Sequence, residues 1–228
     1  IGRCDGIAAE YASSSRLIRF NHNFENDILA AARNMAKRYK CHAGHNQTLE
    51  QYALSIFDAT RKFHGMGARE RLLLQIAVTL HSCGKFISIR NSNESSYNLI
   101  MSTEIIGLSH LEREIIANVV RYNIRDFDYD MIQLETHIGE ENTGDLNVGA
   151  ITILIAKLTA ILRLANSMDK THKAKMQDCR MAIREGELVI TTGYTGDLAL
   201  ERASFEQKAD FFEEIFGIRP VLKQKRRV

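Results

Sequence analysis

Apolar side chains recur every three to four residues through the first three quarters of the chain, the spacing of helices that bury one face. Helices are therefore expected over about 24–39, 49–60, 72–80 and 109–120. The last of these opens with a capping box from Ser109 to Glu112. The segment Leu146–Met168 is apolar on nearly every side, which predicts a helix at the centre of a bundle.

The pattern changes near residue 177. Arg180–Arg184 and Glu187–Thr192 alternate as the two strands of a hairpin do, around a turn at Glu185-Gly186. A capping box at Ser204 and Gln207 predicts the start of a last helix, which Gly217 ends after Phe216. A short strand is expected over Arg219–Lys223. The predicted fold class is mainly α, a helical bundle with a small α/β C-terminal appendage.

Composition supports a soluble globular protein with a real core, because 45% of the 228 residues are apolar and 25% are charged. The net charge of +2 gives no strong field for nucleic acid or for an anionic membrane. No apolar run approaches the roughly 20 residues that a membrane span needs, and no signal-peptide pattern opens the chain. A cytoplasmic location is expected, with reduced thiols at four cysteines that lack metal-type spacing: Cys4, Cys41, Cys83 and Cys179.

Three residues near the ends of predicted helices are candidate metal ligands: His45, His81 and Asp169. Two imidazoles and a carboxylate are enough to hold a divalent transition metal with open positions. Such an ion can activate water against a phosphoester. The alternative is that both histidines are ordinary partly buried side chains and that Asp169 caps a turn before Thr171-His172.

The run Leu80–Ile87 resembles the LHDxGK signature of HD-domain phosphohydrolases, with His45 and Asp169 at the positions of their first histidine and last aspartate. A more specific resemblance is to the exopolyphosphatase and guanosine pentaphosphate phosphohydrolase (Ppx/GppA) family. It is carried by Ser95–Ile100, Gly107–Glu112, Val119–Tyr122, Asp5–Tyr11 and Leu198–Gly217.

The resemblance implies an HD-like helical domain that follows an actin-like half. The expected divisions are a linker from a missing actin-like N-terminal half at 1–20, the HD-like domain at 21–176 and a small α/β domain at 177–228. The first residue is Ile1 rather than methionine, so the chain is expected to be trimmed or to be a piece of a longer protein.

The chain departs from the HD pattern at three positions. Ser82 replaces the aspartate of the HD pair, and Glu94 and Asn123 stand where two-metal HD domains have further histidines. A binuclear centre is therefore not expected, while a single divalent ion on His45, His81 and Asp169 stays open.

The resemblance also implies that catalysis lies in the actin-like half, with magnesium serving the full-length parent. No phosphate-binding glycine loop is present in this sequence, and Gly65-Met66-Gly67 is interpreted as a turn between helices. No catalytic residue is therefore assigned, and no cofactor is expected in this chain apart from that single ion.

Three functions remain open. The first is the C-terminal domain of a phosphohydrolase that removes terminal phosphate from polyphosphate or guanosine pentaphosphate, with this domain binding polyphosphate and helping to form a homodimer. Its candidate ligand residues are basic and form two groups. The first group is Arg33, Lys37, Arg38 and Lys40, and the second is Lys170 and Lys173, with Lys175 beside it. A basic tail follows at Lys223–Arg227. A group of this kind is more often a solvated helix end than a ligand site. The second function is an autonomous metal-dependent HD-type phosphohydrolase acting on a nucleotide or phosphoester. The third is a purely structural dimerisation domain.

Sequence-specific nucleic-acid binding is not expected, because the chain is near-neutral and has no recognisable motif.

Overall fold

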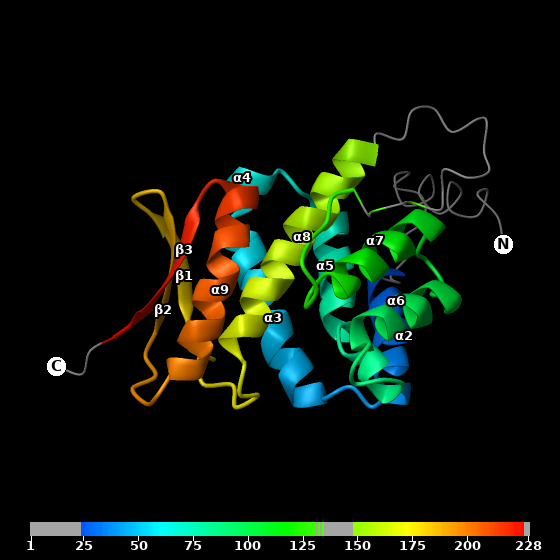
Figure 1. The fold of residues 1–228 in the computed structure, drawn as a ribbon, viewed down its shortest axis with the longest axis horizontal. Coiled ribbons are helices and arrows are strands. Elements are labelled where there is room, and N and C mark those ends of the chain that lie inside the picture. The colour runs from blue at the N-terminus through cyan, green and yellow to red at the C-terminus, as the bar shows by residue number, and fades with distance from the viewer. Residues whose placement is uncertain (1–23, 131, 133, 135–147, 226–228) are drawn as a thin grey trace, which may run out of the picture.

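Helices dominate the computed structural model, which describes residues 24–130, 132, 134 and 148–225 (Figure 1). The described helices are α2 (Phe24–Arg38), α3 (Ala43–Ala59), α4 (Arg61–His64), α5 (Ala68–Leu80), α6 (Ser92–Ser102), α7 (His110–Arg121), α8 (Val148–Met168) and α9 (Ala199–Phe216), with the 3-10 helix η1 (Cys83–Phe86). The mainly α prediction is confirmed. The proposed linker at 1–20, the stretch Asp5–Tyr11, the first residues of 146–168 and the end of the basic tail lie outside the described residues.

Helix α8 is the central element, and it packs against α3, α7 and α9 (Figure 1). Its second half is almost wholly buried, from Ile155 to Met168. By length and hydropathy α8 does reach the range of a membrane span, so the expectation that no apolar run does so was wrong. More than half of the most apolar stretch of α8 is buried inside the bundle, as is typical of the core helix of a soluble protein.

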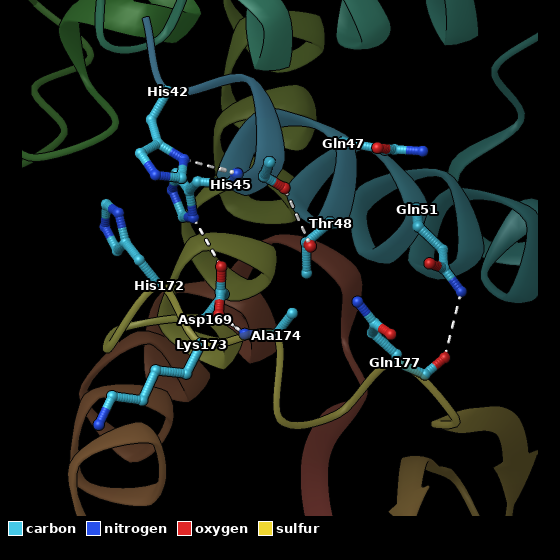
Figure 2. Close-up of a pocket in the computed structure, with 11 residues that line it drawn as sticks. His42, His45, Gln47, Thr48, Gln51, Asp169, His172, Lys173, Ala174 and Gln177 are labelled. Atoms are coloured by element: carbon cyan, nitrogen blue, oxygen red, sulfur yellow. Dashed lines mark hydrogen bonds and ion pairs between the residues drawn. The ribbon is translucent and has the colours of Figure 1, made fainter.

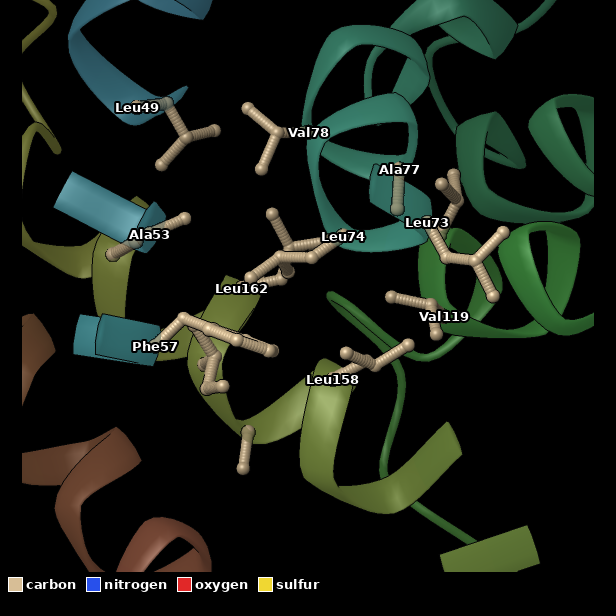
Figure 3. Packing of buried hydrophobic residues seen from close by; sticks show 14 of the residues in the cluster. Leu49, Ala53, Phe57, Leu73, Leu74, Ala77, Val78, Val119, Leu158 and Leu162 are labelled. Atoms are coloured by element: carbon tan, nitrogen blue, oxygen red, sulfur yellow. The ribbon is translucent and has the colours of Figure 1, made fainter. Parts of the chain in front are cut away.

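One hydrophobic cluster fills the space between the helices (Figure 3). Side chains of α3, α5, α7 and α8 meet in it, among them Phe57, Leu74, Val119 and Leu158. Burial of each large aliphatic or aromatic side chain stabilises the fold by about 1.5–3 kcal/mol. The same cluster continues into the C-terminal region at Ile190. The boundary at 176/177 stays a prediction.

The C-terminal sheet has three strands in the order β1 (Arg180–Arg184), β2 (Glu187–Thr192) and β3 (Arg219–Gln224). Strands β1 and β2 are antiparallel, and β3 runs parallel to β2 after the chain has passed through α9. Glu185 and Gly186 both have positive φ, as the tight turn of a two-residue hairpin requires. The predicted hairpin and last strand are confirmed.

Helix α9 begins at Ala199 and not at the capping box predicted from Ser204 and Gln207, so that prediction was wrong. The side chain of Asp197 accepts a hydrogen bond from the N–H of Ala199 at 2.8 Å, and Leu198 is buried. These contacts start the helix six residues earlier, with Leu198 at the N-cap position in place of Ser204, and leave Ser204 inside the helix. The capping box from Ser109 to Glu112 is present as predicted.

Candidate functional site

Two predicted site residues, His45 and Asp169, are in direct contact (Figure 2). His45 lies in the first turn of α3 and Asp169 directly follows α8. Nδ1 of His45 is 2.7 Å from Oδ2 of Asp169, and the N–H of Ala174 donates to Oδ1 at 2.8 Å. Burial alone would raise the pKa of Asp169, but hydrogen bonds from His45 and Ala174 outweigh it and lower that pKa. The carboxylate is therefore ionised, and it fixes the His45 ring.

His81 lies beside them at the end of α5, with its ring centroid 5.4 Å from that of His45. Its Nδ1 is 2.7 Å from the carbonyl oxygen of Val78. Burial lowers the pKa of His81 to about 3, so the imidazole is neutral. Since a carbonyl only accepts, the single proton is on Nδ1 and Nε2 carries the lone pair.

Two further histidines, His42 and His172, join this cluster although sequence reasoning did not select them (Figure 2). The rings of His172 and His45 stack with centroids 3.8 Å apart. His42 caps α3, and its Nδ1 accepts a hydrogen bond from the N–H of His45 at 3.0 Å. The three-residue spacing of His42 and His45 was a usable signal. His172 had none, because its place depends on a left-handed backbone turn after α8.

The loop after His81 is held by a close backbone contact at Gly84. A Cβ on Gly84 would lie 2.0 Å from the carbonyl oxygen of Ser92, and the N–H of Gly84 donates to Oγ of Ser96 at 2.8 Å. Ser96 belongs to the stretch Ser95–Ile100 that carried the family resemblance. Two of the motifs recognised in the sequence therefore pack on each other and position Ser82.

Glu94 and Asn123 stand apart from the histidine cluster. Oε1 of Glu94 accepts hydrogen bonds from Arg121 at 2.8 Å and Arg125 at 3.0 Å, which ties α6 to the end of α7. Asn123 is buried, and its side-chain amide has no hydrogen-bond partner within the described structure. Neither residue lines the cavities described next.

Three cavities surround the start of α3 and share lining residues. Cavity A, of about 480 Å³, and cavity B, of about 280 Å³, both border His42, His45 and His172. Cavity C, of about 630 Å³, shares Gln47 with cavity A and Cys41 with cavity B. These three neighbouring cavities are together called here the histidine trough.

Most of the predicted basic residues line this trough. Arg33 and Lys37 border cavity C, Lys40 borders cavity B, and Lys173 borders cavity A. Lys85, which the sequence did not single out, also borders cavity B. Arg38 and Lys170 are exposed and do not line the trough. Lys175 is instead engaged inside the fold, where Nζ donates to Glu201 at 3.1 Å.

As placed, the predicted metal ligands are not arranged around a common ion. The carboxylate of Asp169 faces Nδ1 of His45 and holds that ring, and Ser82 supplies a hydroxyl where the HD pattern has a second carboxylate. Among the described residues, no group of three His, Cys, Asp or Glu side chains is arranged to hold a metal. A single ion on His45, His81 and Asp169 stays a prediction.

The fold and this site define a mainly helical domain with a small C-terminal sheet and a histidine–aspartate cluster where helices end, in which His45, His81 and Asp169 are buried. The family model of the Ppx/GppA phosphatase, domain III, matches residues 29–209. The chain therefore belongs to the Ppx/GppA phosphatase family, as its motifs predicted. A search of curated proteins finds no match to the chain.

Proposed function

We propose that this chain binds the polyphosphate substrate of an exopolyphosphatase-family phosphohydrolase and leaves cleavage to another part of that protein. The parent would remove terminal phosphate from polyphosphate or guanosine pentaphosphate. Its actin-like half would supply the catalytic residues and the magnesium. Within this chain no residue is assigned to catalysis.

The histidine trough carries this proposal. The two basic groups lie about 130 residues apart in the sequence, yet Lys40 and Lys173 border neighbouring cavities that share the lining residues His42, His45 and His172. Polyphosphate has about one negative charge per phosphate, so a row of ammonium and guanidinium groups matches it. Arg33 adds to this row, because its ion pair with Glu50 is long, at 3.5 Å, and exposed.

A cytoplasmic homodimer is part of the same proposal. Cys41, Cys83 and Cys179 are free thiols, which suits a reducing compartment. Phe86, Ile87 and Ile89 are exposed beside the trough and offer an apolar surface for a second subunit.

The test is polyphosphate binding by the purified chain at increasing salt. A charge-driven contact weakens as counterions screen it, so affinity should fall steeply with ionic strength. The double variant Lys37→Ala/Lys173→Ala should bind about tenfold more weakly, whereas Lys62→Ala, an exposed lysine on α4, should change affinity less than about twofold. Affinity that neither salt nor the double variant lowers would contradict the proposed binding role and favour the purely structural one.

An autonomous phosphohydrolase is the second candidate, favoured by one observation. Both His45 and His81 use Nδ1 in a hydrogen bond, as metal-binding histidines do, and so present Nε2. The arrangement of Asp169 and the serine at position 82 oppose it. Phosphate release from polyphosphate in the presence of manganese, abolished by His81→Ala, would establish this activity and displace the binding role.

A further inference from the structure

We propose that cavity B, beside Ser82 and between Lys40 and Lys85, binds a phosphate-type oxyanion in the place where an HD domain would hold a metal. The inference rests on the proposed polyphosphate-binding function, and it names the position of one phosphate group of that chain. It follows from the poor fit of a cation at this site.

The charge around cavity B favours an anion. Lys40 and Lys85 both line it, and none of its described lining residues carries a carboxylate. Neither ammonium group has an ion-pair partner among the described residues. The ionised carboxylate of Asp169 lines cavity A and not cavity B, and its oxygens accept hydrogen bonds from His45 and Ala174.

The positions of both lysines are set by local structure. Lys40 has a left-handed backbone, with φ of 51°, in the turn that ends α2. Its Nζ lies 5.9 Å from the ring centroid of Phe86, a cation–π contact that holds the ammonium at the rim of the cavity. Lys85 lies in η1, next to the close contact of Gly84 with Ser92.

Ser82 decides the sign of the ligand. An aspartate at this position would add a negative charge to the cavity wall, which attracts a cation and repels a phosphate. A serine hydroxyl can donate a hydrogen bond to a phosphate oxygen. With serine at this position, the described lining of the cavity keeps the net positive charge of Lys40 and Lys85.

The ligand chemistry, a phosphate oxyanion, can come from the polyphosphate chain or from free orthophosphate. Calorimetric titration of the whole chain with tripolyphosphate and, separately, with orthophosphate distinguishes these sources. Tighter binding of tripolyphosphate assigns the site to a chain that continues along the trough. Equal affinity for the two assigns it to free phosphate.

Ser82→Asp is the decisive variant. It should weaken tripolyphosphate binding by about tenfold, since a new negative charge faces the ligand. Ser82→Ala removes one neutral hydrogen bond and should weaken it by only about two- to fivefold. Lys40→Ala/Lys85→Ala should weaken it by about tenfold, and the matched control Lys62→Ala by less than about twofold. If Ser82→Asp fails to fold, as judged by its thermal melt, the tripolyphosphate affinity of Lys40→Ala/Lys85→Ala decides the test.

The outcomes separate this site from the broader proposal. Equal tripolyphosphate affinity in wild type, Ser82→Asp and Lys40→Ala/Lys85→Ala overturns the site while polyphosphate binding elsewhere in the trough stands. No binding of either short anion to wild type also overturns the site. Binding of short anions that depends on these residues, without binding of long polyphosphate, supports the site and overturns the proposed function.

Discussion

Nδ1 of His45 lies 2.7 Å from Oδ2 of Asp169, so the first turn of α3 is joined to the end of α8 across 124 residues of sequence. Both side chains are almost completely buried. A buried carboxylate in a hydrogen-bonded pair stabilises a fold mainly because its partners would otherwise be left unpaired. The pair therefore stabilises the fold by joining α3 to the end of α8, and it also lines the histidine trough.

Asp169→Ala should lower the free energy of unfolding by about 3 kcal/mol, because it leaves His45 and the N–H of Ala174 without an acceptor. Asp169→Asn keeps an acceptor for one of them and should cost less than the alanine variant. Urea denaturation followed by circular dichroism measures both. Equal free energies of unfolding for wild type and Asp169→Ala would show that the pair does not stabilise the fold.

Stability should decline in mild acid because His81 is buried and neutral. Its pKa falls from 6.5 in the unfolded chain to about 3 in the fold, so between these values the unfolded chain binds the extra proton. The free energy of unfolding then falls as pH decreases through this window, by up to about 1.4 kcal/mol per pH unit for one group. Burial also lowers the pKa of His64 and His172, which act in the same direction.

His81→Asn tests this assignment, since its amide can still donate to the carbonyl of Val78 but does not titrate. Unfolding measured from pH 4.5 to pH 6.5 should show a shallower dependence in the variant, with the two curves converging toward acid. Parallel curves for wild type and variant would assign the acid sensitivity to other groups.

Much of the fold was predictable because burial of one helix face imposes its spacing on the sequence. The periodic segments at 24–39 and 72–80 correspond to α2 and α5, and the capping box at Ser109 marked the start of α7 correctly. The start of α9 was not predictable in this way. There a local capping pattern at Ser204 was overridden by the burial of Leu198 and the hydrogen bond from Ala199 to Asp197.

The site was predictable only as far as family motifs reached. His45, His81 and Asp169 do converge, as expected from residues at helix ends. His172 and Lys85 escaped notice because their positions depend on a left-handed turn and on the packing of a short loop against α6. Such backbone contacts leave no periodic signal in one sequence.

Gly84→Ala should be strongly destabilising. The new methyl group would lie 2.0 Å from the carbonyl oxygen of Ser92 and 2.4 Å from the backbone nitrogen of Ser96, so η1 or α6 must move. A loss of about 3 kcal/mol or more is expected, together with weaker anion binding in cavity B. Gly186→Ala is the control for the steric clash: Gly186 has a positive φ, which is unfavourable for alanine and which Gly84 does not have, but nothing lies near the new atom, and about 1 kcal/mol is expected. A similar loss in both variants would mean that α6 yields easily.

Lys175 and Lys173 should behave in opposite ways although they are two residues apart. Lys175 pairs with Glu201, whose side chain is only 1% exposed, and Thr171 also donates to that carboxylate. Burial would raise the pKa of Glu201, but the hydrogen bonds from Thr171 and Lys175 lower it, so Lys175→Ala leaves a buried negative charge without its cation. The expected loss in unfolding free energy is about 3 kcal/mol. Lys173→Ala should cost less than about 0.5 kcal/mol yet weaken polyphosphate binding.

A double-mutant cycle completes this last test. Lys175→Met combined with Glu201→Gln removes both charges and should recover most of the stability lost in Lys175→Met alone, since no uncompensated charge remains buried. Chemical denaturation of the four proteins gives the coupling energy. If the losses in unfolding free energy are additive, Lys175 and Glu201 are not energetically coupled. Lys175 would then be counted among the basic residues available to bind polyphosphate.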